Sequence, residues 1–156
     1  MSQWNPGRLT RALFRAPTWL YGRGLGWLLT GRLMCLTHVG RRSGRHYRTV
    51  LEVVGRRGEE IYVVSGFGSS SDWYRNVTAN PPVEVINGRR RFTPVCRTLE
   101  PAEAASVIAD YERRNRLITP VVRKGLSKLV GWDYDGTPTA RERLVHEVPL
   151  LGLRPA

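Results

Sequence analysis

The apolar positions at the start of the chain repeat at helical spacing. Within residues 8–16 the apolar side chains recur every three or four positions, arginines take the opposite side, and Pro17 breaks the pattern. A second apolar and aromatic segment begins at Thr18, a residue type that caps helices, and stops before Gly31. We therefore expect residues 1–31 to form an N-terminal helical extension.

From Leu33 the apolar positions follow the alternating period of β-strands. Strands are expected over residues 33–39, 46–54, 61–64, 83–86, 89–99 and 144–153. The clearest hairpin lies at Asn87-Gly88, because Asn-Gly readily adopts the two positive φ angles of a type I′ turn. Further helices are predicted over residues 73–79, after Pro101 and around residues 122–130, with a loop over residues 132–138.

The order of these elements separates two fold classes. A doubly wound sheet would need a helix between successive strands, whereas here most of the six strands follow one another directly. An antiparallel, mainly β (α+β) barrel with flanking helices fits better. The chain has 156 residues, 41% of them apolar and 24% charged, so residues 1–156 are expected to form a single folded domain.

The charge is strongly basic and almost entirely arginine. There are 25 basic against 13 acidic residues, the formal net charge is +12, and only Lys124 and Lys128 are lysines. The planar guanidinium suits phosphate and carboxylate oxygens, so nucleic acid, an anionic membrane surface or a polyanionic cofactor are all compatible with this charge. Charge alone does not choose among them, and many of these arginines can simply be solvated.

Metal, disulfide and membrane-spanning sites are not predicted. Cys35 and Cys96 lie in apolar or strand-like stretches typical of free buried cysteines, and the three histidines share no metal-ligand spacing. No apolar run approaches the ~18 residues of a spanning helix, and no cleavage site follows the basic N-terminus. We expect that segment to be retained in a cytoplasmic protein.

The first candidate site is the turn Gly40-Arg41-Arg42-Ser43-Gly44. Its two glycines allow the backbone to curl so that N–H groups point at a common anion, while Arg41, Arg42 and Ser43 offer further hydrogen bonds. This combination predicts a phosphate site. The alternative is a solvated basic hairpin tip.

The second candidate site is the serine-rich loop that leads into residues 72–76. A helix begins there, and helix N-termini favour anions. Trp73 or Tyr74 could cover a planar ring, although packing in the core is the alternative for both. Walker, CxxC, HExxH and G-x-S-x-G motifs are absent from the sequence, so the common nucleotide, metal and nucleophile sites are not indicated.

Together these motifs resemble the deazaflavin-dependent nitroreductase family. The resemblance rests on residues 36–44, 48–51, 63–66 and 72–81, and the GRRSG turn followed by the WYxNxxANP helix is its most specific part. It implies a split β-barrel with six strands, the fold shared with flavin-binding oxidoreductases. It also implies coenzyme F420 as the cofactor and hydride transfer as the chemistry, with a homodimer as the common assembly.

The resemblance further implies a set of site residues. Arg41, Arg42 and Ser43 would hold the phosphate and part of the glutamyl tail. Tyr47, Arg48, Thr49, Val50, Leu51 and Glu52 would line the deazaflavin, with backbone groups contributing as much as side chains. Val63, Val64, Ser65, Asp72, Trp73, Tyr74, Arg75 and Asn76 would complete the pocket. Ser65 and Tyr111 are the predicted catalytic residues, which would hydrogen-bond the oxygen of the acceptor.

The acceptor is less well specified than the cofactor. Val50 stands where the family usually has proline, Asp72 replaces a residue near a common proline, and the loop from Ser65 to Trp73 is short. Quinones, enones or activated alkenes, and nitroaromatics are all candidate acceptors. The alternatives to an F420-dependent enzyme are an FMN-binding split barrel and a basic membrane-surface module without catalysis.

The basic residues are not expected to bind nucleic acid, because no aromatic stacking platform is interleaved with them. Peripheral membrane contact is compatible with an enzyme. The arginines and aromatic residues of the segment 8–30 could lie on an anionic leaflet and bring the site to lipophilic quinones.

Overall fold

A computed structural model describes residues 31–66 and 68–156. The elements are, in chain order, β1 (Leu33–Val39), β2 (His46–Arg57), β3 (Glu60–Val64), the short 3-10 helix η2 (Gly68–Ser70), α2 (Asp72–Ala79), β4 (Glu84–Asn87), β5 (Arg90–Phe92), β6 (Pro94–Thr98), α3 (Pro101–Arg114), α4 (Thr119–Val130), α5 (Pro138–Glu147) and β7 (Leu150–Pro155). The helices predicted over residues 8–16 and 18–30 lie outside the described residues.

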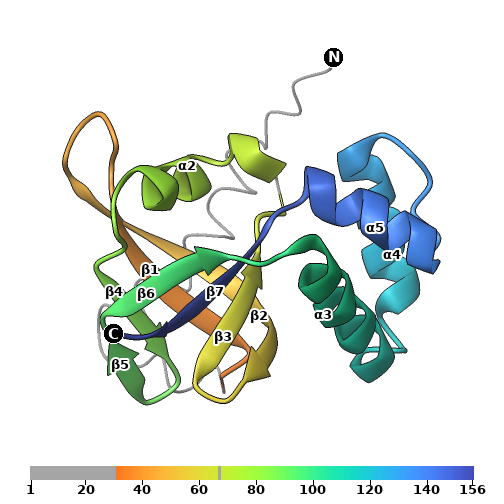
Figure 1. Ribbon diagram of the computed structural model, residues 1–156, viewed down its shortest axis with the longest axis horizontal. Helices are drawn as coiled ribbons and strands as arrows, with labels where there is room; N and C mark the ends of the chain where they lie inside the picture. The colour runs from red at the N-terminus through yellow and green to blue at the C-terminus, as the bar shows by residue number, and fades with distance from the viewer. Residues whose placement is uncertain (1–30, 67) are drawn as a thin grey trace.

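The strands form one antiparallel sheet that curves into a barrel (Figure 1). The strand order is β5-β4-β1-β2-β3-β7-β6. The two edge strands, β5 and β6, are consecutive in the chain and only Thr93 separates them, so the chain itself connects the two edges. This arrangement confirms the predicted split barrel with flanking helices, but with seven strands rather than six.

The additional strand arises where residues 89–99 were expected to form one strand. Residues 90–92 pair with β4, whereas residues 94–98 pair with β7 on the opposite edge. Pro94 has no N–H to continue the first ladder, and it begins the new strand.

The turn between β4 and β5 also differs from the prediction by one residue. Asn87 pairs with Arg90, so Gly88, with a φ of +59°, and Arg89 form the turn. The side chain of Asn87 explains this register. Its Nδ2 donates to the carbonyls of Gly31 and Leu33 at 3.0 and 2.9 Å, which keeps Asn87 buried within the strand.

The strand predicted over residues 144–153 is wrong in its first part. Thr137 caps a helix by accepting the N–H of Ala140 at 3.2 Å, and Pro138 occupies its first turn. Leu144 and Val145 are therefore buried on α5, and the final strand begins at Leu150.

Two apolar clusters lie on the two faces of the sheet, because strand side chains alternate between faces. The cluster inside the barrel consists of Met34, Leu36, Ile61, Val63, Val77, Val85, Leu151 and Leu153. The other cluster packs the outer face of the sheet, through residues such as Val54 and Tyr62, against α3 and α5. Figure 1 shows α3, α4 and α5 gathered on one side of the barrel.

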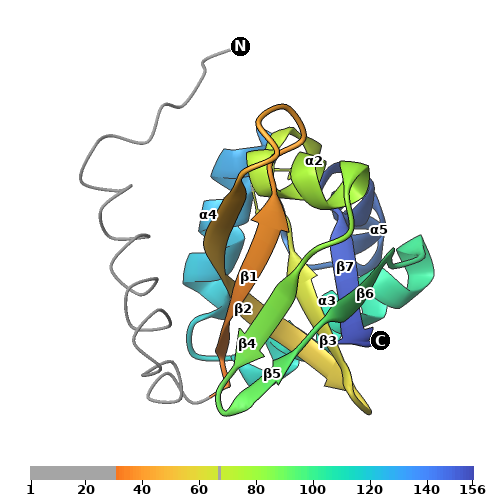
Figure 2. The ribbon, with the colours of Figure 1, turned by 90° about the vertical axis from the view of Figure 1, so that its left-hand side faces the viewer.

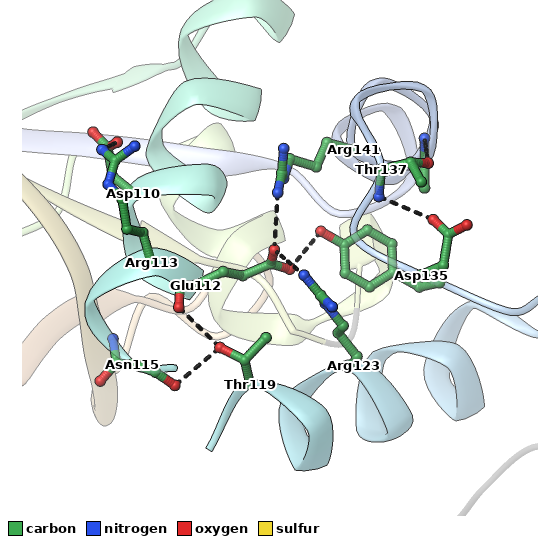
Figure 3. A network of polar contacts seen from close by, with 11 residues as sticks. Asp110, Glu112, Arg113, Asn115, Thr119, Arg123, Asp135, Thr137 and Arg141 are labelled. Atoms are coloured by element: carbon green, nitrogen blue, oxygen red, sulfur yellow. Dashed lines mark hydrogen bonds and ion pairs between the residues drawn. The ribbon is translucent and has the colours of Figure 1, made fainter. Parts of the chain in front are cut away.

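A buried carboxylate, Glu112 of α3, connects the three helices (Figure 3). It accepts hydrogen bonds from Arg123 of α4 at 3.0 Å, from Arg141 of α5 at 3.1 Å and from the hydroxyl of Tyr134 at 2.7 Å. Burial opposes ionisation of this group, but these three hydrogen bonds outweigh it and hold the pKa of Glu112 below its usual range. We refer to α3, α4, α5 and this network as the helix cluster.

Candidate functional site

The β1–β2 hairpin carries the first predicted site at its tip. The turn is closed by hydrogen bonds from Gly44 N to Gly40 O at 2.9 Å and from Gly40 N to Arg45 O at 2.8 Å. A Cβ at Gly40 would lie 2.5 Å from Ser43 Oγ and 2.6 Å from the ring of Tyr47. A larger residue at this position would have to displace the side chains of Ser43 and Tyr47. Figures 1 and 2 show the tip beside α2 at one end of the barrel.

Arg41 attaches this turn to α2. Its backbone N–H and Nη1 donate to Asn76 Oδ1 at 3.1 and 3.0 Å, and its Nη2 donates to Asp72 Oδ1 at 3.1 Å. The structure thus brings together Arg41, Asp72 and Asn76, which two separate motifs contribute. Arg41 is largely occupied by these partners, so its guanidinium positions the turn as much as it is offered to a ligand.

His38 extends this network and was not among the predicted site residues. Since Asn76 Oδ1 accepts from Arg41, its Nδ2 is the donor toward His38 Nδ1, at 3.1 Å. Burial lowers the pKa of His38 despite the nearby charge of Asp72, which leaves the ring neutral and able to accept at neutral pH. The imidazole also stacks against the ring of Tyr47, with centroids 6.0 Å apart.

Three further arginines surround the turn with exposed side chains: Arg42, Arg45 and Arg48. Within the described residues, no carboxylate forms an ion pair with any of them. Ser43 Oγ and Tyr47 Oη lie 3.0 Å apart beside them, so hydroxyl groups accompany the charges. We call Arg42, Ser43, Arg45, Tyr47 and Arg48 the cationic hairpin. Its guanidinium groups, together with the hydroxyls beside them, suit phosphate or carboxylate oxygens.

The first half of β2 has an open edge beside the cationic hairpin. β1 pairs with β2 over residues 46–52, whereas β3 pairs with β2 only from Val53 onward. Val53 N donates toward β1, to Arg32 O at 2.7 Å. Because backbone groups alternate along an antiparallel strand, the N–H and C=O of Arg48, Val50 and Glu52 point the other way, where no described strand pairs with them.

The predicted ligand-lining run from Tyr47 to Glu52 is therefore divided between two faces. Leu51 packs with the barrel interior, together with Val53 of the same strand. Val50 and Glu52 lie on the outer face, where Val50 packs against Cys35 and Ile86. Thr49 is two residues from Leu51, so its side chain lies on the same, inward face of the sheet. A planar ligand at this edge would meet backbone groups and the outward side chains, but not the whole run.

Tyr111 and Glu52, two predicted site residues from distant segments, are in contact. Tyr111 Oη on α3 donates to Glu52 Oε1 at 2.9 Å, and Arg32 lies 3.6 Å from the same carboxylate. Burial, together with the charge of Glu52, raises the pKa of Tyr111 to about 12. The phenol is therefore protonated at neutral pH and can donate a hydrogen bond.

Ser65 and its two neighbours, Val63 and Val64, each have different surroundings. The side chain of Ser65 is fully buried, and its hydroxyl donates to Gly68 O at 2.6 Å, with Ser71 Oγ at 3.0 Å. Val63 fills the barrel interior and Val64 packs against the outer cluster. The Ser65 hydroxyl therefore shapes the loop, and its hydrogen is already engaged.

The aromatic residues at the start of α2 have a mainly structural setting. Trp73 and Tyr74 are partly buried against the barrel interior and contact each other edge to face, with centroids 6.1 Å apart. Arg75 is exposed, and its Nε donates to Ser69 O at 3.3 Å.

A groove of about 810 Å³ lies elsewhere, between the far end of β2 and α3. Its lining includes Arg57, Tyr62, Ser106 and Asp110, and none of the predicted site residues. Two arginines of this groove are already engaged, since Arg114 donates to Val54 O at 2.8 Å and Arg113 pairs with Asp110. It is therefore a weaker candidate for an anionic ligand than the cationic hairpin.

A comparison with known families identifies the protein class. The family model described as F420H(2)-dependent quinone reductase matches residues 13–119. The chain belongs to this family. It is therefore an oxidoreductase, and its cofactor is coenzyme F420 rather than FMN.

One solved structure, with a TM-score above 0.5, supports the same fold. HutZ, the heme storage protein from Vibrio cholerae, is 17% identical, with 88% of this chain and 90% of that chain covered and a TM-score of 0.52. A structure described as F420-H2 dependent reductase (FDR-A) is 21% identical, with 79% and 94% covered and a TM-score of 0.45. No curated protein matches the sequence.

The described residues fit the cofactor of this family. F420 carries a phosphate and acidic groups on a tail attached to a planar deazaflavin, and the cationic hairpin adjoins the open edge of β2. Among residues 31–66 and 68–156 there is no helix long and apolar enough to cross a membrane. The same residues contain no group of three or more histidine, cysteine, aspartate or glutamate side chains able to hold a metal ion.

Proposed function

We propose that this enzyme reduces a quinone with F420H2, and that F420 binds across the cationic hairpin and the open edge of β2. One observation carries the proposal: three exposed arginines without a described carboxylate partner lie beside backbone groups of Arg48, Val50 and Glu52 that no described strand pairs with. Charge at one end and backbone polar groups at the other match a ligand with an anionic tail and a planar polar ring.

Each part of the site has a separate task in this proposal. Arg42 and Ser43 bind the phosphate and acidic groups of the tail. Arg41, held by Asp72 and Asn76, fixes the turn against α2 so that these groups keep their geometry. The cofactor supplies the hydride, and the protein places the acceptor within reach of it and excludes water.

Tyr111 is the stronger candidate for contact with the acceptor. It is neutral, and its hydroxyl already donates to an oxygen, that of Glu52. Donation to a quinone oxygen instead would stabilise the negative charge that develops there when hydride arrives. Ser65, whose hydrogen is engaged by Gly68 O, would act by holding the loop at the edge of the site.

Anaerobic oxidation of F420H2 by a water-soluble quinone tests this function directly. We expect quinones to be reduced faster than nitroaromatics or enones, and Tyr111→Phe to lower kcat about 100-fold, the usual contribution of a positioned proton donor. Ser65→Ala should have a smaller effect. Full turnover in both variants would contradict the assignment of Tyr111 and Ser65, and preference for a nitroaromatic would contradict the quinone.

Cytoplasmic location, a homodimer and a single domain over residues 1–156 stay predictions. So does peripheral membrane contact through the segment 8–30. Vesicle flotation of the full chain, with and without substitution of Arg8, Arg11 and Arg15 by glutamine, tests the contact. Equal flotation of both forms would remove that segment from the proposal.

A further inference from the structure

The corner between α3 and α4 exposes an unusual number of apolar side chains. Six large hydrophobic side chains are exposed in the part of the chain that the structure describes, and four of them lie between residues 117 and 129. Leu117 is 96% exposed, Val121 74%, Ile118 42% and Leu129 39%. Single exposed apolar residues are normal on protein surfaces, but a cluster of them marks an interaction site.

The exposure of Leu117 is fixed by the turn that carries it. Asn115 Nδ2 donates to Tyr111 O at 2.8 Å, and Thr119 Oγ1 donates to the carbonyls of Glu112 and Asn115, both at 2.9 Å. Figure 3 shows Asn115 and Thr119 closing this turn below Glu112. The turn is therefore ordered by hydrogen bonds within the helix cluster, and Leu117 is held outward on it.

The apolar residues share one outward stripe with both lysines of the chain. Residues 121, 124 and 128 are spaced by three and four positions, so they lie along one side of α4, and Leu117 lies in the turn just before this helix. The opposite side, with Val122, Leu126 and Val130, packs against the outer apolar cluster. The turn and α4 together thus present an apolar end, at Leu117 and Val121, and a cationic end, at Lys124 and Lys128.

The segment that carries this corner has positive charges only. Residues 113–131 contain six cations and no carboxylate. Arg123 is engaged by Glu112, Arg113 by Asp110, and Arg114 by the Val54 carbonyl. The other three cations are Arg116, Lys124 and Lys128, and no described carboxylate forms an ion pair with any of them.

We propose that this corner, consisting of Arg116, Leu117, Ile118, Val121, Lys124 and Lys128, docks on an anionic lipid bilayer. Leu117, Ile118 and Val121 would enter the headgroup boundary, while the long lysine side chains keep their ammonium groups at the level of the lipid phosphates. A second copy of the chain is a poorer occupant. In a two-fold interface the same cationic segment would be brought close to itself, and like charges would repel.

The corner follows the proposed acceptor residue, Tyr111, along the chain. Leu117 follows Tyr111 by six residues, across the same hydrogen-bonded turn. A lipophilic quinone leaving the bilayer would therefore meet α3 near Tyr111. This last step rests on the proposed function, whereas the docking itself rests only on the exposed apolar residues and their charge.

Vesicle flotation of the full chain tests the docking. The vesicles are phosphatidylcholine alone or phosphatidylcholine with phosphatidylglycerol. Lys124→Gln/Lys128→Gln should weaken partition onto the anionic vesicles about 25-fold, because each lysine near such a surface contributes roughly a fivefold factor. Leu117→Asn/Val121→Asn should weaken it about tenfold or more through lost apolar burial. The matched control is Arg90→Gln/Arg91→Gln, which removes two charges from β5 and should leave partition within about twofold.

Two results would overturn the proposal. One is equal partition of the wild type and both α4 variants. The other is a wild-type dimer in sedimentation that Leu117→Asn/Val121→Asn converts to a monomer, since the corner would then be a self-association face. If Leu117→Asn/Val121→Asn lowers the melting temperature, the partition of Lys124→Gln/Lys128→Gln alone tests the docking. Turnover with a water-soluble quinone should be unchanged in every variant, which separates the failure of docking from the failure of the proposed function.

Discussion

The cationic hairpin and the helix cluster both use arginine, but in opposite ways. In the helix cluster, Arg123 and Arg141 turn inward to the buried carboxylate of Glu112. In the cationic hairpin, Arg42 and Arg45 are exposed and form no ion pair with a described carboxylate. A guanidinium whose partner is inside the protein contributes to the fold, whereas one without a partner is available to a ligand.

Arg41 lies between these two cases. It belongs to the hairpin, but Asp72 and Asn76 satisfy much of its guanidinium, as Glu112 does for the arginines of the helix cluster. The hairpin therefore combines a fixed arginine with free ones. The fixed arginine orders the turn, and the other arginines keep their charges available to a ligand. The following predictions test which arginines stabilise the fold and which bind the ligand.

The largest effect on stability is expected from Glu112→Ala. It leaves Arg123 and Arg141 without their buried partner, which should lower the free energy of unfolding by about 3 to 5 kcal/mol. Urea unfolding measures this loss. The matched control is Glu142→Ala on exposed α5 surface, with an expected change within about 0.5 kcal/mol. Affinity for F420 should not change, and equal losses in the two variants would contradict a structural role for Glu112.

A smaller loss of about 2 kcal/mol is expected from Asn76→Ala, since the partly buried polar groups of Arg41 and the buried ring of His38 lose their partner. This variant should also weaken F420 binding, because the turn is no longer attached to α2. Thr78→Ala, at an exposed position of the same helix, controls for changes in helix stability. Loss of stability with unchanged F420 affinity would show that Arg41 does not position the site.

The smallest effect, about 1 kcal/mol at neutral pH, is expected from Tyr111→Phe through loss of the hydrogen bond to Glu52. The pKa of Tyr111 is raised to about 12 in the folded protein, so the wild type holds this proton more tightly when folded. The stability difference should therefore be fully present below about pH 10, the unfolded pKa, and disappear as the pH rises through the folded value. Unfolding of both proteins at about pH 8 and about pH 11 measures it. A difference independent of pH would contradict the contact.

Strand and helix patterns in the sequence predict most of this fold, because alternation and helical spacing are local properties. The misplaced elements depend on distant partners. Asn87 stays in the strand because the carbonyls of Gly31 and Leu33 and the guanidinium of Arg56 bind its side chain. The break at Thr93 depends on which strands reach residues 90–92 and 94–98, and no local pattern contains that information.

The candidate site also has features that the local sequence predicts and features that depend on the folded structure. The motifs predict Arg41, Asp72 and Asn76 as site residues, and these residues do come together. The motifs do not reveal that the Ser65 hydroxyl is taken by Gly68 O, a contact that depends on the folded loop. Glu112 was missed, although it follows Ile108 by four residues on the apolar side of α3. A carboxylate at an apolar helical position is a usable signal for a buried ion pair.

Fluorescence titration with F420 tests the location of the cofactor most directly. The proteins are the wild type, Arg42→Ala/Arg45→Ala in the cationic hairpin, and Arg90→Ala/Arg91→Ala as a control with the same loss of charge. We predict micromolar or tighter binding by the wild type and the control, and about 100-fold weaker binding by the hairpin variant, since two charge-assisted contacts are lost. Equal affinity in all three proteins would contradict binding at the hairpin.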